Sequence, residues 1–196
     1  MTSRMRLQPV PPEQLDPAQR ALYDDVVDNI VKTLDGQQSF ITRDSTGALL
    51  GPWNAWIHEP VVGAAMWHLS KVMFRAATLP ETLRQVAILT VGSHYRAAYE
   101  VYAHSGLSRH YFDPDQVAAL ARGEIPDGGL SPDETLVHDI SKALVSGGPL
   151  SDDLYAQGVR VLGQKMLSEL IFLVSLYALV SVNLNGFNVP IPTEGS

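Results

Sequence analysis

A glutamate and a histidine four residues apart, in the segment YEVYAH at residues 99–104, are the side chains of this sequence that most plainly suggest chemistry. Residues four apart lie on the same face of a helix, so Glu100 can reach His104. A histidine oriented by a carboxylate is a common general acid–base arrangement, because the carboxylate fixes the tautomer and favours the charged imidazole. The pair therefore predicts proton transfer at His104.

The neighbours of this pair leave two interpretations open. They are small apolar residues and tyrosines: Ala97, Ala98, Val101, Ala103, Tyr95, Tyr99 and Tyr102. Such neighbours favour partial burial, and burial beside a partner is how proteins shift the proton affinity of an acid or base. In the other interpretation, Arg96 pairs with Glu100 at a helix surface and Glu100 orients His104, a network that would contribute at most about 1 kcal/mol.

A metal site is a third interpretation. Glu100 and His104 could be two ligands of iron or another divalent ion, with His58 or His94 completing the site. The chain otherwise has no glycine-rich phosphate loop, no G-x-S-x-G and no H-E-x-x-H motif. Nothing in it therefore predicts nucleotide binding, serine hydrolysis or a zinc protease, and we expect chemistry without a cofactor.

The composition narrows the classes of partner. The chain has 196 residues, which fits a single domain, 1–196. Cysteine is absent, which excludes thiol chemistry and thiolate metal sites and favours a reducing cytoplasm. The formal charge of −7 disfavours nucleic acid or an anionic membrane surface, because both repel a negative protein. We expect a cytoplasmic protein that binds a small molecule.

One apolar run, LIFLVSLYALVSV at residues 170–182, stands out by its length. A membrane-spanning helix needs about 20 apolar residues, so this shorter run predicts a buried helix and no membrane partner. Because the run is apolar on every side, it also indicates self-assembly into a homo-oligomer. The N-terminal residues 1–14 have no apolar core of the signal-peptide type, so no export is expected.

Helix starts are easy to recognise, because several segments open with a capping residue, a proline in the first turn, and an acid or amide three residues after the cap. These caps are Asp16, Thr78, Asp113 and Ser131, and Ser151 is a further cap. Glycines at 36, 123, 128–129 and 147–148 predict helix ends. The pattern predicts an all-α fold of about seven or eight helices.

Strand-like alternation is nearly absent, apart from a possible short hairpin at residues 39–50. The hairpin lies within a long irregular segment, residues 36–52. Segments of this length in compact domains often form lids or binding loops, although a loose surface excursion is an equal alternative.

Four segments in the same order resemble the carboxymuconolactone decarboxylase family, whose wider superfamily includes the alkylhydroperoxidase D proteins. They are LDPAQRALYDDVV (15–27), GPWNAWIHEP (51–60), LPETLRQVAILTVGSHYRAAYEVYAHSGLSRH (79–110) and LVSVNLNGFNVPIP (179–192). The resemblance implies an alkylhydroperoxidase D-like all-α fold that assembles into trimers or hexamers. It also implies active sites near subunit contacts, with the E-x-x-x-H helix lining the pocket.

The resemblance is to the branch of the superfamily that lacks cysteines. The peroxidase branch carries Cys-x-x-Cys-x-x-x-His and an upstream glutamate. Counting back from His104, the two cysteine positions hold Ala97 and Glu100, and the upstream acid position holds Gln85. Cysteine-based peroxidase activity is therefore excluded. Gln85 can hydrogen-bond but cannot exchange protons, and it reaches the pocket only if the helix breaks, for example at Gly92-Ser93.

The remaining candidates for substrate contact are Arg84, Arg96, His58, Trp53, Trp56, Tyr99 and Gln85. Arg84 could hold a substrate carboxylate through a two-pronged contact, or pair with Glu81 at the surface. Trp53 and Trp56 could form an apolar wall over a ring-shaped substrate, or belong to the core. His58 could lie near the pocket entrance, as the resemblance implies, or act structurally at a helix end.

These observations together predict a lyase of the decarboxylase type, or an isomerase or cyclase. Its substrate would be a small conjugated acid, lactone or enol. His104 would be the general acid, Glu100 would fix its tautomer, and Arg84 or Arg96 would neutralise a substrate carboxylate or enolate. In the alternative, the protein is a non-catalytic oligomer that binds a ligand, and the Glu100–His104 pair is a buried polar tie.

Overall fold

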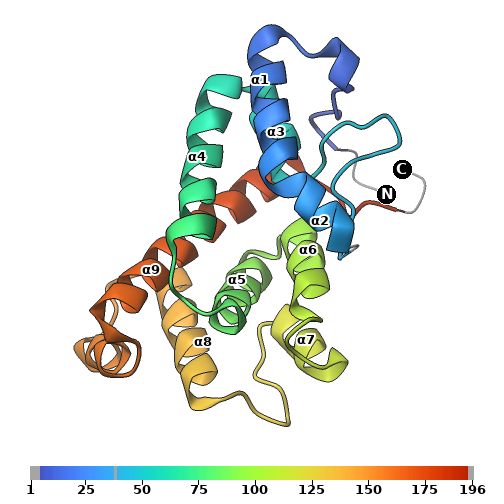
Figure 1. The fold of residues 1–196 in the computed structure, drawn as a ribbon. Coiled ribbons are helices and arrows are strands. Elements are labelled where there is room, and N and C mark those ends of the chain that lie inside the picture. Colours follow the sequence, from blue (N-terminus) through green and yellow to red (C-terminus); the bar gives the residue numbers. More distant parts are fainter. Residues whose placement is uncertain (1–4, 38, 194–196) are drawn as a thin grey trace.

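The structure is a computed structural model that describes residues 5–37 and 39–193, and its described elements are helical (Figure 1). The α-helices are α1 (Pro17–Val26), α2 (Lys32–Gln37), α3 (Pro52–His58), α4 (Pro60–Ala76), α5 (Glu81–Tyr95), α6 (Ala98–Ser108), α7 (Pro114–Ala121), α8 (Pro132–Val145) and α9 (Asp152–Phe187). A 3₁₀ turn, η1 (Pro12–Gln14), precedes α1, and a π-helical turn, η2 (Val27–Val31), links α1 to α2. The predicted all-α fold is confirmed.

Three of the predicted helix starts are confirmed as complete capping boxes. Asp16, Asp113 and Ser131 each accept a hydrogen bond from the backbone three residues on, and that residue's side chain accepts one from the cap. Ser151 caps α9 through the backbone N–H of Leu154. These reciprocal bonds satisfy backbone groups that a helix end otherwise leaves unpaired.

The prediction that Thr78 caps a helix is wrong. α5 begins at Glu81, after Pro80, with no side-chain cap. Thr78 binds α9 instead: its backbone N–H donates to Glu169 Oε2 at 2.7 Å and its hydroxyl donates to the same oxygen at 3.1 Å. A long-range carboxylate therefore takes the hydrogen bonds that the local pattern assigned to a cap.

The structure differs in detail from two predictions: the end of the first helix at Gly36 and the short hairpin at residues 39–50. α2 continues to Gln37, and η2 interrupts the helical path before it. In residues 39–50, the described backbone forms one isolated antiparallel bridge, between Arg43 and Leu49, rather than a hairpin.

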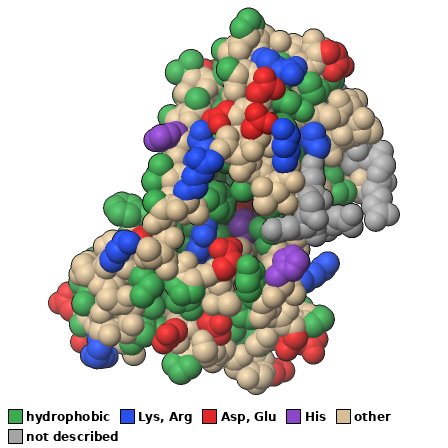
Figure 2. Space-filling view, in the orientation of Figure 1, with side chains coloured by type: hydrophobic (Ala, Val, Ile, Leu, Met, Phe, Trp, Pro, Cys, Tyr) green, Lys and Arg blue, Asp and Glu red, His purple; other side chains and the backbone are tan. Residues whose placement is uncertain are grey.

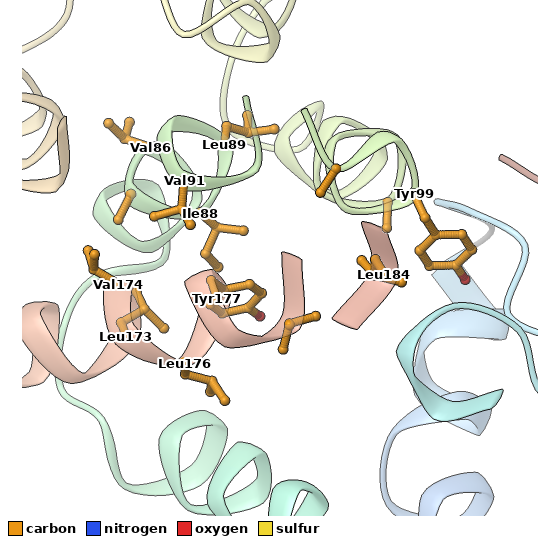
Figure 3. Close-up of a cluster of buried hydrophobic side chains, with 14 of the residues drawn as sticks. Val86, Ile88, Leu89, Val91, Tyr99, Leu173, Val174, Leu176, Tyr177 and Leu184 are labelled. Carbon is orange, nitrogen blue, oxygen red and sulfur yellow. The ribbon is translucent and has the colours of Figure 1, made fainter. Parts of the chain in front are cut away.

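Helix α5 is the centre of the core, with a continuous buried stretch from Leu83 to Gly92. It packs against α6, α7, α8 and α9. Figure 3 shows the apolar side chains of α5, among them Ile88 and Val91, facing Leu173 and Tyr177 of α9. Because four helices, α6 to α9, contact α5, its position is fixed on several sides.

Helix α9 is kinked and is only partly covered. Gly163 has φ 76° and ψ 158°, which breaks the helical path. The apolar run at residues 170–182, for which the sequence predicts a buried helix and self-assembly, leaves Phe172, Leu179 and Val182 exposed in the single chain. By length and composition α9 could cross a membrane, but half of its most apolar stretch is buried within the protein, a pattern that core helices of soluble proteins also show.

The irregular segment 39–51 is fastened to α6. The Tyr99 hydroxyl donates to the carbonyl oxygen of Ile41 at 3.0 Å, and the Ile41 N–H donates to the Tyr102 hydroxyl at 3.1 Å. Two glycines permit close contact: a Cβ on Gly106 would lie 2.1 Å from the Ser39 carbonyl oxygen, and one on Gly51 would lie 2.3 Å from the Tyr99 ring. The segment is therefore a fixed loop rather than a loose excursion.

Candidate active site

A cavity of about 90 Å³ lies where α3, α4, α6 and α9 converge. Figure 2 shows a hollow near the middle of this face of the molecule, with a histidine side chain inside it. The cavity wall is mostly apolar, and its phenylalanines, tryptophans and tyrosines are Phe40, Trp53, Trp56, Trp67, Phe74, Tyr99 and Tyr177. Its ionisable members among the described residues are Glu100, His104 and the two tyrosines. The predicted acid–base pair thus faces an apolar space of small-molecule size.

The turn between α5 and α6 brings Gln85 to His104. α5 ends at Tyr95, and Arg96 adopts the left-handed conformation (φ 54°, ψ 39°) before α6 begins at Ala98. The chain therefore reverses, and the two side chains meet although 19 positions separate them. The break that Gln85 needed occurs, but at Arg96 rather than at Gly92-Ser93.

Gly92 allows α5 and α6 to approach closely at the pair. A Cβ on Gly92 would lie 3.2 Å from Cγ of Glu100 and 3.3 Å from Val101. Both distances are tighter than ordinary van der Waals contact, so a side chain here would push Glu100 away from its place. The small residue thus positions the acid of the pair.

His104 has a different partner at each ring nitrogen. Nδ1 lies 2.8 Å from Gln85 Oε1, and Nε2 lies 3.2 Å from Glu100 Oε1. The second contact is close but not aligned as a hydrogen bond, since Glu100 Oε1 has no aligned donor among the described residues. Both side chains are buried, with His104 7 % and Glu100 3 % exposed. The pair is therefore shielded from bulk water. Interactions between charges are stronger in such a buried environment than in water.

Gln85 is held by a chain of polar contacts along α5. Its Nε2 donates to Glu81 Oε1 at 2.7 Å, and Glu81 Oε2 lies 3.0 Å from Arg84 Nη1. A carboxylate paired with arginine only accepts hydrogen bonds, so the amide nitrogen must face Glu81 and the amide oxygen must face His104. Ser108 donates a longer bond, 3.4 Å, to the same Gln85 oxygen.

Two buried tyrosines border the cavity and differ in their hydroxyl groups. The ring of Tyr177 meets the His104 ring edge-on, with centroids 5.1 Å apart. Burial raises the pKa of Tyr177 well above its ordinary value, and the negative charge of Glu100 adds to this. Burial likewise raises the pKa of Tyr99, with Tyr102 and Glu100 contributing. Both phenols therefore stay protonated and act as neutral donors.

The predicted contact residues separate into two groups. Trp53, Trp56 and Tyr99 line the cavity, whereas Arg84 does not. Arg84 pairs with Glu81, and its guanidinium lies 5.2 Å from the centre of the Phe74 ring. The Glu81 pairing that was one alternative is therefore present, although Arg84 is buried rather than at the surface.

Arg96 and His58 lie away from the cavity. Arg96 is exposed in the turn before α6, and no ion pair joins it to Glu100 within residues 5–37 and 39–193. His58 Nε2 lies 2.8 Å from the carbonyl oxygen of Gln8, a contact of the structural kind. The described residues contain no group of three or more histidines, aspartates and glutamates that could hold a metal ion, and neither His58 nor His94 joins Glu100 and His104.

Sequence reasoning missed two residues of this site. Tyr177 lies 73 positions after His104, and the one signal for it was a tyrosine inside an otherwise apolar run. Glu81 was considered only as a partner of Arg84, and nothing in the sequence linked it to Gln85 and His104. Both become visible only when α5, α6 and α9 are packed together.

Comparison with known proteins does not identify the chain. No protein-family model matches it, and no curated protein matches it significantly. The resemblance to carboxymuconolactone decarboxylases therefore rests on the four sequence segments alone.

Proposed function

We propose that this protein is an acid–base enzyme, an isomerase or a lyase of the carboxymuconolactone decarboxylase type, with His104 and Glu100 as its proton-transfer pair. The observation that carries the proposal is the arrangement of His104, whose two ring nitrogens each face a different buried partner at the wall of an apolar cavity. Buried, partnered acids and bases in a cavity are typical of catalytic sites.

The tautomer of His104 follows from Gln85. Because the Gln85 oxygen faces Nδ1, that nitrogen carries a proton in either charge state. The nitrogen that can exchange a proton in this proposal is therefore Nε2, the one beside Glu100. Gln85, which the Glu81–Arg84 pair holds in place, would fix the tautomer, a role that the sequence assigned to Glu100.

Glu100 and His104 Nε2 lie close enough to exchange a proton, since Glu100 Oε1 is 3.2 Å from Nε2. A proton on either group relieves the repulsion between a carboxylate oxygen and an unprotonated nitrogen at this distance. When the proton is on His104, the pair offers a carboxylate base and an imidazolium acid side by side, which is what moving a proton within a substrate requires.

Isomerisation is better supported than decarboxylation. A decarboxylase substrate is a carboxylate, and Arg84 and Arg96, the residues expected to neutralise it, do not line the cavity. Acid–base assistance of this kind contributes about 10²- to 10⁴-fold in rate. The apolar wall adds positioning and exclusion of water.

The proposal is tested by proton exchange. Purified protein should catalyse the exchange of the hydrogens next to the carbonyl group of cyclopentanone with D2O, which NMR can follow. His104→Gln should abolish this exchange. The circular dichroism spectrum of the variant should match that of the wild type, and its unfolding should remain cooperative. Exchange that persists in His104→Gln would contradict the proposal. Turnover of γ-carboxymuconolactone, measured with and without a chelator, separates lyase from isomerase and tests the metal-dependent alternative.

Self-association is part of the same proposal, as a trimer or hexamer of this chain. Phe172 (65 % exposed) and Val182 (54 % exposed), with Leu179 between them, form an apolar stripe on α9. Stripes of this kind mark interaction surfaces in water-soluble proteins. Light scattering should give a mass above 21.4 kDa, and Phe172→Lys should reduce it. A monomeric wild-type chain would contradict this part.

A further inference from the structure

The cavity wall has two polar groups that the proposed proton transfer leaves unused: the hydroxyl of Tyr177 and the indole N–H of Trp56, which is buried without a hydrogen-bond partner among the described residues. Tyr177 lines the cavity beside Glu100 and His104. Its hydroxyl makes no hydrogen bond within the part of the chain that the structure describes. The hydroxyl of Tyr99, on the same wall, is by contrast committed to the carbonyl oxygen of Ile41. The Tyr177 hydroxyl is not among the fully buried unpartnered atoms, so on the cavity wall it is open to donate a hydrogen bond to a molecule in the cavity.

The charges around the cavity select an uncharged molecule. No lysine or arginine is among the described residues of its wall, and the nearby Arg84 is engaged by Glu81 at 3.0 Å. An anion entering this space would lose its hydration and meet the carboxylate of Glu100 without a free cation. Removing an ion from water is costly unless an opposite charge compensates.

Resting on the acid–base function proposed above, we infer that the site binds a small uncharged carbonyl compound, with its oxygen held by the Tyr177 hydroxyl and the adjacent carbon facing Glu100 and His104. The aromatic wall, with Trp53 and Trp56, fits a flat and largely apolar body. The ligand class is thus set by the Tyr177 donor, the absence of lysine and arginine from the described wall, and the apolar surround.

The reaction that this arrangement supports is conversion of the ketone to its enol. The Glu100 carboxylate takes the proton as the C–H bond next to the carbonyl breaks, and the His104 imidazolium gives its Nε2 proton to the carbonyl oxygen as the new O–H bond forms. A proton shift from Glu100 to His104 then restores the pair. Tyr177 keeps its proton and stabilises the charge that builds on the oxygen.

The test uses two matched probes, cyclopentanone and cyclopentanecarboxylate, with the full chain. Wild-type protein should bind the ketone more tightly than the carboxylate by calorimetry. Tyr177→Phe should weaken ketone binding by about two- to tenfold, the loss of one hydrogen bond. The infrared carbonyl band of bound, ¹³C-labelled cyclopentanone should also move to higher frequency in that variant. Tyr99→Phe is the control, since its hydroxyl is already bonded, and should leave the band in place.

His104→Gln separates this inference from the proposed function. It should remove exchange with D2O, whereas adding Tyr177→Phe to the His104→Gln variant should still move the carbonyl band, because the Tyr177 bond does not depend on His104. A band that Tyr177→Phe does not move, tighter binding of the carboxylate, or binding of neither probe would overturn the inference. Binding with the expected band but no exchange by the wild-type protein would instead contradict the acid–base function.

Discussion

The two walls of the cavity are held in place by different forces. On the α6 wall, hydrogen bonds from α5 hold His104 through Gln85 and Glu81. On the α3–α4 wall, packing fixes Trp53 and Trp56: a Cβ on Gly63 would lie 2.2 Å from the Trp56 carbonyl oxygen, so the two helices are in backbone contact. The first wall depends on individual atoms and the second on volume. The rate of proton transfer should therefore be sensitive to isosteric substitutions around His104. The shape of ligand that the cavity accepts should not change with such substitutions.

The largest effect on the rate of proton exchange is expected at His104. His104→Gln keeps a side chain of similar reach but removes the titrating nitrogen, so the rate of proton exchange should fall by about 10²- to 10⁴-fold. The exposed His94 provides the matched control, and His94→Gln should leave the rate unchanged. Equal losses in both variants would show that the effect does not arise from the buried pair.

The second effect tests the hydrogen bonds behind His104. Gln85→Leu leaves Nδ1 of His104 and a Glu81 oxygen without this partner, which should lower the free energy of unfolding by about 1–3 kcal/mol. It should also lower kcat more than it changes KM, because the imidazole can then adopt either tautomer. Thr90→Val, a buried change on the same helix, should leave the pH profile of the rate unaltered. A Gln85→Leu variant with wild-type kcat would contradict the prediction, because it would show that catalysis does not depend on the tautomer that Gln85 fixes.

The third effect belongs to the aromatic wall. Trp67 Nε1 donates to Asp25 Oδ2 at 3.0 Å, and Lys71 binds the same oxygen. Trp67→Phe keeps an aromatic ring but removes this bond, so urea unfolding should show a loss of about 1 kcal/mol. The pH profile of exchange should keep its shape, because no group of the proton pair is touched. A shifted profile would mean that the two walls are coupled.

The smallest effect lies outside the cavity, at Glu169. Burial alone would raise the pKa of this carboxyl, but hydrogen bonds from Thr78 and Leu79 outweigh it and lower the pKa below its ordinary value. A lowered folded-state pKa stabilises the protein above the unfolded pKa, about 4.3, and this contribution is lost as the pH falls through the folded value. Glu169→Gln should therefore cost no more than about 1 kcal/mol at neutral pH, and the difference from wild type should shrink below about pH 4. A difference independent of pH would contradict this.

Local patterns in the sequence predicted the parts of this molecule that depend on a few adjacent residues. The capping boxes at Asp16, Asp113 and Ser131 were readable because each is closed within four residues. The reach of Glu100 to His104 was readable for the same reason. Both depend only on helical geometry.

The parts that depend on packing were not readable. Thr78 resembles a cap but binds Glu169, 91 positions away. Gln85 meets His104 because Arg96 takes a left-handed turn, which no residue preference for arginine predicts. Arg84 and Arg96 were expected to contact the substrate but lie off the cavity wall, because a charge pattern does not say which side of a helix faces a cavity.

The glycines that fasten the irregular segment 39–51 decide where this chain can be engineered. Gly51 and Gly106 lie against Tyr99 and Ser39, so a tag or reporter domain inserted into this segment would pull the cavity wall apart. The glycines at 128–129 and 147–148 have no atoms within 4 Å of the place that a Cβ would occupy, and they lie in loops that do not line the cavity. Fusion proteins and split reporters should therefore be joined at those two loops.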